Sequence, residues 1–125
     1  MLALVLMMAA LQDVPSAPAS TFVEVEALPG QVVTHVGWLT TPIPRFPREA
    51  MRGQVRAGTV RLSCIVTVQG RFRNCEITEE TPPGFSFGRE ALAAVRAVRL
   101  TPRTIDGRPV ETHVQFSVGF RRSGP

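Results

Sequence analysis

Apolar and polar residues alternate along three stretches of this chain, which predicts three β-strands. The first two stretches, residues 58–68 and 71–79, lie on either side of a turn at Gln69 and Gly70. The third, residues 110–120, has the clearest alternation, because its even-numbered residues are apolar or threonine and its odd-numbered residues are polar or glycine. Such alternation is typical of an antiparallel sheet with one buried face and one solvated face.

Two segments have the features of α-helices. Residues 46–53 predict a short helix, because Pro47 falls in the first turn, where a missing amide hydrogen costs nothing, and a glycine ends the segment. A second helix is predicted from residue 87 to about residue 100, since four apolar residues recur three or four positions apart: Phe87, Ala91, Val95 and Val98. Ser86 is its expected N-cap, and Pro102 disfavours helical geometry in the residue before it. This helix is amphipathic and is expected to lie on a sheet.

The only two cysteines lie at mirror-image positions about the predicted turn. A two-residue turn centred on Gln69 and Gly70 gives four opposed pairs: Val68 with Arg71, Val66 with Arg73, Cys64 with Cys75, and Leu62 with Ile77. Directly opposed residues of antiparallel strands are close enough for a disulfide. A three-residue loop closed by a glycine bulge would shift the register by one residue and place the sulfurs on opposite faces, but the hydrophobic alternation favours the first register. The alternative is a pair of buried free cysteines.

The N-terminus has the composition of a secretory signal. Its first eleven residues are all apolar, and small and polar residues follow. About 20 apolar residues are needed to span a bilayer, so a cleaved signal peptide is predicted, and the alternative is a first core element of a cytosolic domain. Attachment to the membrane through an uncleaved N-terminus stays open. The expected organisation is a signal peptide at residues 1–19, an extended N-terminal arm at 20–44, a folded domain at 45–121 and a tail at 122–125, and cleavage near residues 10–12 is the alternative end of the signal.

Charge is distributed unevenly along the chain. All 14 basic residues are arginines, and all lie at or beyond Arg45. From there onward 14 arginines face seven acids, a balance of +7, whereas the first 44 residues carry three acids and no base. The arginines are scattered singly, without the clusters and interleaved aromatic residues of nucleic-acid grooves. A solvated basic surface is therefore expected, and no nucleic-acid partner.

Side chains suited to catalysis or metal binding are sparse. The chain has no tyrosine and no lysine, and Glu79 and Glu80 are neighbours at a strand end, where alternate pleating points their side chains apart. His35 and His113 stand at no recognised ligand spacing, and His113 falls on the solvated face of its strand. The sequence therefore predicts no enzyme, no metal site, no cofactor and no small-molecule substrate.

Taken in order, these elements resemble the C-terminal domain of the TonB family of periplasmic energy transducers. The resemblance runs from residue 44 to residue 120, about three-fifths of the chain. It is carried by five segments: RFPREA at 45–50, GTVRLSCIVTVQGRF at 58–72, CEITEETPPGFSFGREAL at 75–92, RLTP at 99–102 and DGRPVETHVQFSVGF at 106–120. The family usually has tyrosine at the position of Phe46.

The resemblance implies an α+β fold, in which a three-stranded antiparallel sheet carries two helices on one face. It also implies that the domain binds the TonB box, a short extended segment of an outer-membrane receptor, as an added strand at an exposed sheet edge. The expected edge is residues 110–120, and its candidate binding residues are Val110, Thr112, Val114, Phe116 and Val118. The family's pattern also places Arg45, Phe46 and Pro47 near the receptor segment. The alternative for Phe46 and Pro47 is a hydrophobic staple on the first helix.

Two functions remain open at this point. A working TonB needs a helix in the inner membrane and a long proline-rich spacer, and neither is recognisable in this sequence. The expected function is therefore that of a periplasmic module that binds receptor peptides in TonB-dependent transport. The alternative is a stand-alone envelope interaction or structural module without energy transduction, in which the edge strand pairs with a second copy to form a homodimer.

Overall fold

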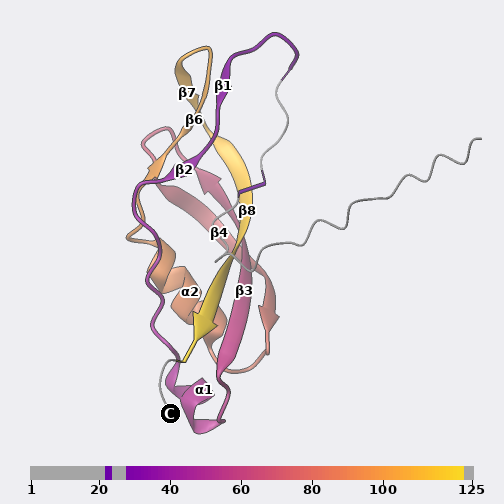
Figure 1. The fold of residues 1–125 in the computed structure, drawn as a ribbon, viewed down its shortest axis with the longest axis vertical. Coiled ribbons are helices and arrows are strands. Elements are labelled where there is room, and N and C mark those ends of the chain that lie inside the picture. Colours follow the sequence, from indigo (N-terminus) through magenta and orange to yellow (C-terminus); the bar gives the residue numbers. More distant parts are fainter. Residues whose placement is uncertain (1–21, 24–27, 123–125) are drawn as a thin grey trace, which may run out of the picture.

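The computed structural model describes residues 22–23 and 28–122, so the predicted signal peptide lies outside the described residues. Within them, three long strands, five short strands and two helices follow one another (Figure 1). Their order is β1 (Val33–Thr34), β2 (Gly37–Trp38), α1 (Arg48–Arg52), β3 (Ala57–Val66), β4 (Phe72–Thr81), α2 (Phe87–Val95), β5 (Leu100–Thr101), β6 (Arg103–Ile105), β7 (Arg108–Val110) and β8 (Thr112–Arg121).

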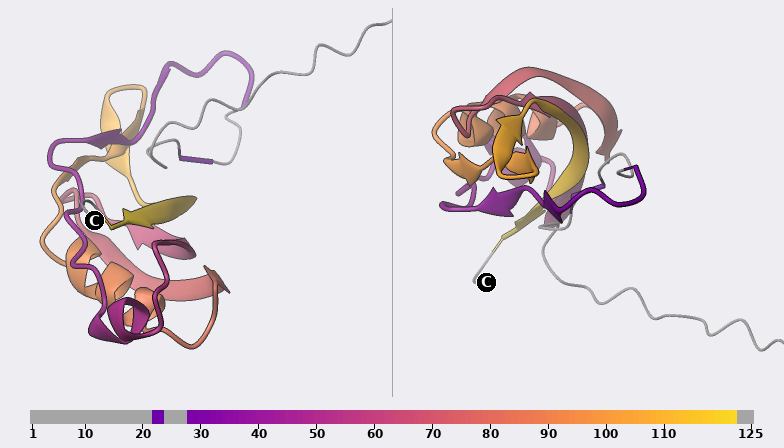
Figure 2. Two further views of the ribbon diagram at one scale, coloured as in Figure 1. Left: turned by 60° about the horizontal axis from the view of Figure 1, so that its bottom comes forward. Right: turned by 90° about the horizontal axis from the view of Figure 1, so that it is seen from above.

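The three long strands form one antiparallel sheet in the order β4-β3-β8. Helix α2 contacts β3 and β4 on one face of this sheet, and the strands curve beside it (Figure 2). Helix α1 lies near the end of the sheet where β8 finishes, and its Ala50 is buried in the same core (Figure 1). The predicted α+β fold is thus confirmed.

Alternation along β3 and β8 separates the buried face of the sheet from the open one. The even-numbered residues of both strands point toward the helices and are buried: Val60, Leu62, Cys64 and Val66 in β3, and Thr112, Val114, Phe116, Val118 and Phe120 in β8. Phe87, Ala91 and Val95 of α2 complete this core. Each buried large apolar side chain contributes about 1.5–3 kcal/mol, so this face supplies most of the driving force for folding.

The ends of α2 differ from the prediction. Ser86 adopts a left-handed conformation with φ of 65° and makes no side-chain capping bond. The carboxylate of Glu80, at the end of β4, accepts hydrogen bonds from the amides of Gly84 and Gly88 instead. The helix also ends at Val95, before the expected residue 100, because Leu100 is drawn into β5, where its amide donates to the Gly70 carbonyl.

Two short strands of the expected N-terminal arm pair with strands of the domain. Strand β1 pairs with β6, and β2 pairs with β5. The predicted third strand is divided, which corrects its expected start: Val110 belongs to β7 and pairs with Arg103 in the β6–β7 hairpin. That hairpin turns at Asp106 and Gly107, both with positive φ. Because Val110 pairs within the hairpin, β8 begins only at Thr112.

The turn between β3 and β4 has three residues, which corrects the predicted register. Thr67 donates its amide to the Arg71 carbonyl at 2.8 Å, and Gly70 has a φ of 78°. Val66 therefore pairs with Phe72, where a two-residue turn would have paired it with Arg73. This is the one-residue shift that would separate the cysteines if it continued along the hairpin.

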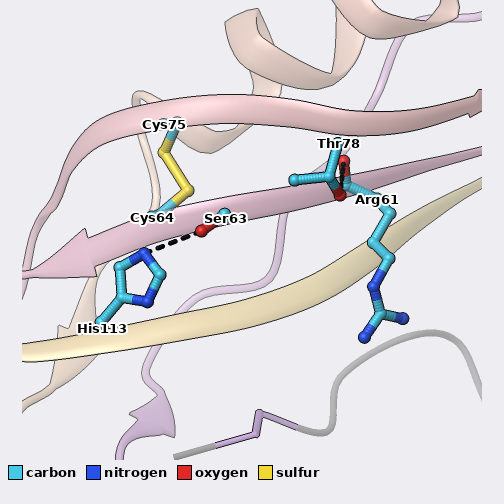
Figure 3. The surroundings of a disulfide bond; sticks show 6 residues. All are labelled: Arg61, Ser63, Cys64, Cys75, Thr78 and His113. Atoms are coloured by element: carbon cyan, nitrogen blue, oxygen red, sulfur yellow. Dashed lines mark hydrogen bonds between the residues drawn. A yellow bond between two sulfur atoms is a disulfide. The ribbon is translucent and has the colours of Figure 1, made fainter.

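A bulge in β4 cancels that shift. Asn74 adopts a left-handed conformation with φ of 50°, and beyond it Ser63 pairs with Glu76 and Leu62 with Ile77. The cysteines therefore return to the same face and form the predicted disulfide, with their Cα atoms 4.1 Å apart. Figure 3 shows the disulfide joining β3 to β4.

The turn between β3 and β4 lies in close contact with β5 at Gly70. A Cβ atom on Gly70 would lie 2.0 Å from the Leu100 carbonyl oxygen, whereas one on Gly107, at φ of 79°, would have no atom within 4 Å. We predict that Gly70→Ala lowers the free energy of unfolding by more than about 2 kcal/mol and Gly107→Ala by only about 1 kcal/mol, the cost of the left-handed backbone alone. Urea denaturation measures both, and equal losses would contradict this close contact.

The disulfide should contribute to stability through the loop that it closes. Its cysteines are 11 residues apart in sequence, and closing a loop of this size is worth about 2 to 3 kcal/mol. Replacing both cysteines by alanine should lower the melting temperature by roughly 10 °C, as measured by circular dichroism. Reductant should lower the melting temperature of the natural protein and leave that of the double variant unchanged. No effect of reductant on the natural protein would sink this assignment.

Candidate functional site

The sheet has two outer edges, one on β4 and one on β8, because β3 lies between them. Strand β8 pairs with β3 along all ten of its residues, from Thr112 opposite Val66 to Arg121 opposite Ala57. On the outer side of β8, one residue among those described forms a main-chain pair with the strand. Val23 forms an isolated antiparallel bridge with Gln115, and its amide donates to the Gln115 carbonyl at 3.4 Å. Figure 1 shows this short segment beside β8.

The bridge to Val23 tells which main-chain groups of β8 face outward. Main-chain bonding directions alternate along an antiparallel strand, and the Gln115 carbonyl points away from β3. The same therefore holds for its neighbours two residues away, His113 and Ser117. The main-chain groups of the residues between them, Val114 and Phe116, are turned toward β3.

The residues predicted at this edge are mostly turned inward. The side chains of Thr112, Val114, Phe116 and Val118 are at most 5% exposed and belong to the core. Val110 is partly buried in β7, outside β8. Their strand forms the edge, but their side chains point to the helix side of the sheet and away from the open face.

The segment of Arg45, Phe46 and Pro47 lies near the other end of β8. Arg45 is exposed, Phe46 is partly buried, and Pro47 is buried directly before α1. The Phe46 ring meets Phe87 edge to face at 5.6 Å, and Phe87 in turn contacts Phe120 in β8 at 5.0 Å. The structure thus links the predicted segment to the end of the predicted strand through one aromatic ring of α2.

An aromatic cluster beside the middle of β8 was not anticipated from the sequence. The rings of Trp38, Phe72 and Phe116 contact one another at 4.9 to 5.8 Å between centroids, and Phe22 stacks on Trp38 at 4.6 Å. The buried-face alternation gives the direction of Phe116. The convergence of the other rings depends on the docking of β2 against β5 and on the shifted register that pairs Phe72 with Val66.

The open face of the sheet is polar and joins its strands by side-chain bonds. Ser63 Oγ and His113 Nε2 are 2.8 Å apart, so His113 is exposed as predicted but also hydrogen-bonded (Figure 3). Arg73 forms an ion pair with Glu111 at 2.6 Å, and Arg61 donates to the Gln115 side chain at 3.4 Å. In the part of the chain that the structure describes, no three metal-ligating side chains form a cluster.

None of the helices among the described residues is long and apolar enough to cross a membrane.

Comparisons with known proteins agree with this fold. The profile of the family described as Gram-negative bacterial TonB protein C-terminal matches residues 42–121. A search of solved structures found the solution NMR structure of the TonB C-terminal domain of Pseudomonas aeruginosa, with a TM-score of 0.56 and 22% sequence identity over 74% of this chain and 91% of that one. A comparison with curated proteins gave no match. Since the family profile covers well over half of the sequence, the chain belongs to the TonB C-terminal family.

Proposed function

We propose that this protein binds an extended peptide of an outer-membrane receptor as an added strand along the outer edge of β8. The observation that carries the proposal is the unequal pairing of β8: β3 bonds its inner side throughout, whereas the described residues bond its outer side only at Gln115. An edge of this kind presents unpaired amides and carbonyls, which a second extended chain can satisfy. TonB C-terminal domains are periplasmic and take part in TonB-dependent transport, which fits such a partner.

The alternation of β8 supports a particular arrangement of the bound peptide. The outward main-chain groups of His113, Gln115 and Ser117 would bond the peptide backbone, which gives affinity without regard to sequence. Alternate side chains of the peptide would then lie on the open face beside these residues and on the helix side beside Phe116. The predicted even-numbered residues of β8 would thus act by holding the strand in place.

The other edge of the sheet is less suited to strand addition. Strand β4 carries irregularities near Asn74 and Thr78, where its register against β3 shifts by one residue each time. It also presents acidic side chains, including Glu76 and Glu79, and α2 contacts it. Bulges and charges of this kind are the devices by which proteins block edge pairing.

The proposal places the protein in the periplasm, after export by the N-terminal signal predicted from its sequence. It involves no catalysis and no cofactor, in keeping with a family of transport and interaction domains. Its partner is the TonB-box segment of a TonB-dependent receptor. The competing arrangement is a homodimer in which β8 of one copy pairs with β8 of another, because the same edge could serve both.

The test is a titration of the protein with a synthetic TonB-box peptide, followed by NMR. Amide signals of His113, Gln115 and Ser117 should shift. Ser117→Pro removes one outward amide and should weaken binding about tenfold, the equivalent of one lost hydrogen bond of about 1.4 kcal/mol. Ser117→Ala is the matched control and should bind nearly as well as the natural protein, since only its side chain changes.

The melting temperatures of both variants establish that they fold. No shift at millimolar peptide, or equal binding by the proline and alanine variants, would reject strand addition at β8. Analytical ultracentrifugation of the peptide-free protein distinguishes the dimer, which would show twice the chain mass and would dissociate as peptide is added if the two share this edge.

A further inference from the structure

Phe22 fills an aromatic site directly beside the proposed binding edge. Its ring stacks on Trp38 with centroids 4.6 Å apart and planes at 26°, and it meets Phe116 edge to face at 5.6 Å and Phe72 at 6.2 Å. Aromatic pairs at such distances and angles are favourable beyond the area that they bury. The contacts join the N-terminal segment to three separate strands, β2, β4 and β8.

The residue that contacts the aromatic rings, Phe22, directly precedes the residue that bonds the edge of β8, Val23. Val23 bonds the main chain of Gln115, and Phe22 precedes it, while Phe116 follows Gln115 along β8. Successive side chains of an extended segment point to opposite faces, so Val23, which is 61% exposed, faces the open side while Phe22 turns to the helix side. A single extended segment therefore bonds the edge and fills the aromatic site at the same time.

The receiving site is formed by the folded domain itself. Phe72 and Phe116 stack on each other at 4.9 Å, and Trp38 contacts both at 5.8 and 5.5 Å. Trp38 is fixed by the pairing of β2 with β5, where it lies opposite Leu100. Gly37 beside it allows this close approach, since a Cβ atom there would lie 2.7 Å from Thr101 Oγ1.

We propose that Trp38, Phe72 and Phe116 form a specificity subsite for an aromatic side chain of the added strand, and that Phe22 occupies it in the free protein. The proposal rests on the proposed function and deepens it, because it names the chemistry of the partner: an extended peptide with an aromatic residue directly before the one that pairs with Gln115. Such a peptide must displace the protein's own segment.

Competition between the two segments follows from their contacts. The internal segment belongs to the same chain as its site, so its binding is intramolecular and is favoured over that of a free peptide with the same contacts. Between the described residues 22–23 and β8, the main-chain bond is 3.4 Å long, near the upper limit for a hydrogen bond, whereas the Phe22 ring contacts three other rings. An outside peptide can bond several outward groups of β8, so it displaces the internal segment once it also supplies a ring.

Trp38 provides a direct readout, because it is the only tryptophan of the chain. In the full-length protein, Phe22→Ala should expose the Trp38 ring and shift its fluorescence emission to longer wavelength. Val23→Ala is the matched control: it alters an exposed side chain and keeps the main-chain amide, so the emission should stay unchanged. Unchanged emission in Phe22→Ala, or equal shifts in both variants, would overturn the assignment of Phe22 to this site.

Specificity is tested with a free peptide of residues 20–26, STFVEVE, and with the same peptide carrying Phe22→Ala. Added to the Phe22→Ala protein, the first peptide should return the Trp38 emission toward shorter wavelength and bind at least about tenfold more tightly than the second, as expected for burial of one aromatic side chain. The natural protein should bind the first peptide more weakly than the variant does, since its own segment competes. Equal binding of the two peptides, or no binding of the first at millimolar concentration, would overturn the subsite.

A receptor TonB-box peptide distinguishes failure of the aromatic subsite from failure of the proposed receptor binding. Should that peptide shift the outward amides of β8 yet bind the natural and Phe22→Ala proteins equally and leave Trp38 emission unchanged, strand addition stands and the aromatic subsite fails. Should it fail to bind either protein while STFVEVE binds the variant with its ring preference, the subsite stands and the receptor function fails.

Discussion

Main-chain pairing between β3 and β8 is the interaction on which the rest of this structure depends. Along ten residues it fixes which side chains of β8 face the core and, by the same alternation, which main-chain groups face outward. Phe116 lies opposite Leu62 on the helix side of the sheet and is buried, whereas the main chain of its neighbour Gln115 faces outward, where it bonds Val23. The core and the binding edge are therefore two consequences of a single register, and a slip of one residue would exchange them.

The second constraint on this sheet acts through the hairpin of β3 and β4. Two irregularities, a three-residue turn at Gly70 and a bulge at Asn74, displace the register in opposite directions, so that Cys64 and Cys75 still meet. The shift between them carries Phe72 to the helix side, opposite Val66, where its ring joins Trp38 and Phe116. The shifted pairing between the turn and the bulge thus places Phe72 in the aromatic site, and its cancellation at the bulge allows the disulfide to form.

Much of the fold could be predicted from the sequence, because alternation reports burial directly for a sheet with one open face. It gave the three strands, the amphipathic helix and the cysteine pair. The alternation favours a two-residue turn over the three-residue turn that the structure has, because the bulge at Asn74 restores beyond it the pairing that a two-residue turn would give. The sequence also predicts the binding edge at β8, but the residues that it indicates there are those with buried side chains. The direction of a main-chain group cannot be read from the type of the residue. The contact between Phe22 and Trp38 forms only in the tertiary structure.

Hydrogen exchange along β8 measures the central claim most directly, because it reports each main-chain amide separately. The account predicts that a bound receptor peptide slows exchange at the odd-numbered residues His113, Gln115 and Ser117, whereas Val114 and Phe116, already bonded to β3, exchange slowly with or without the peptide. Slower exchange at alternate residues would identify an added strand. Uniform change along the strand, or protection on β4 with none on β8, would contradict the account.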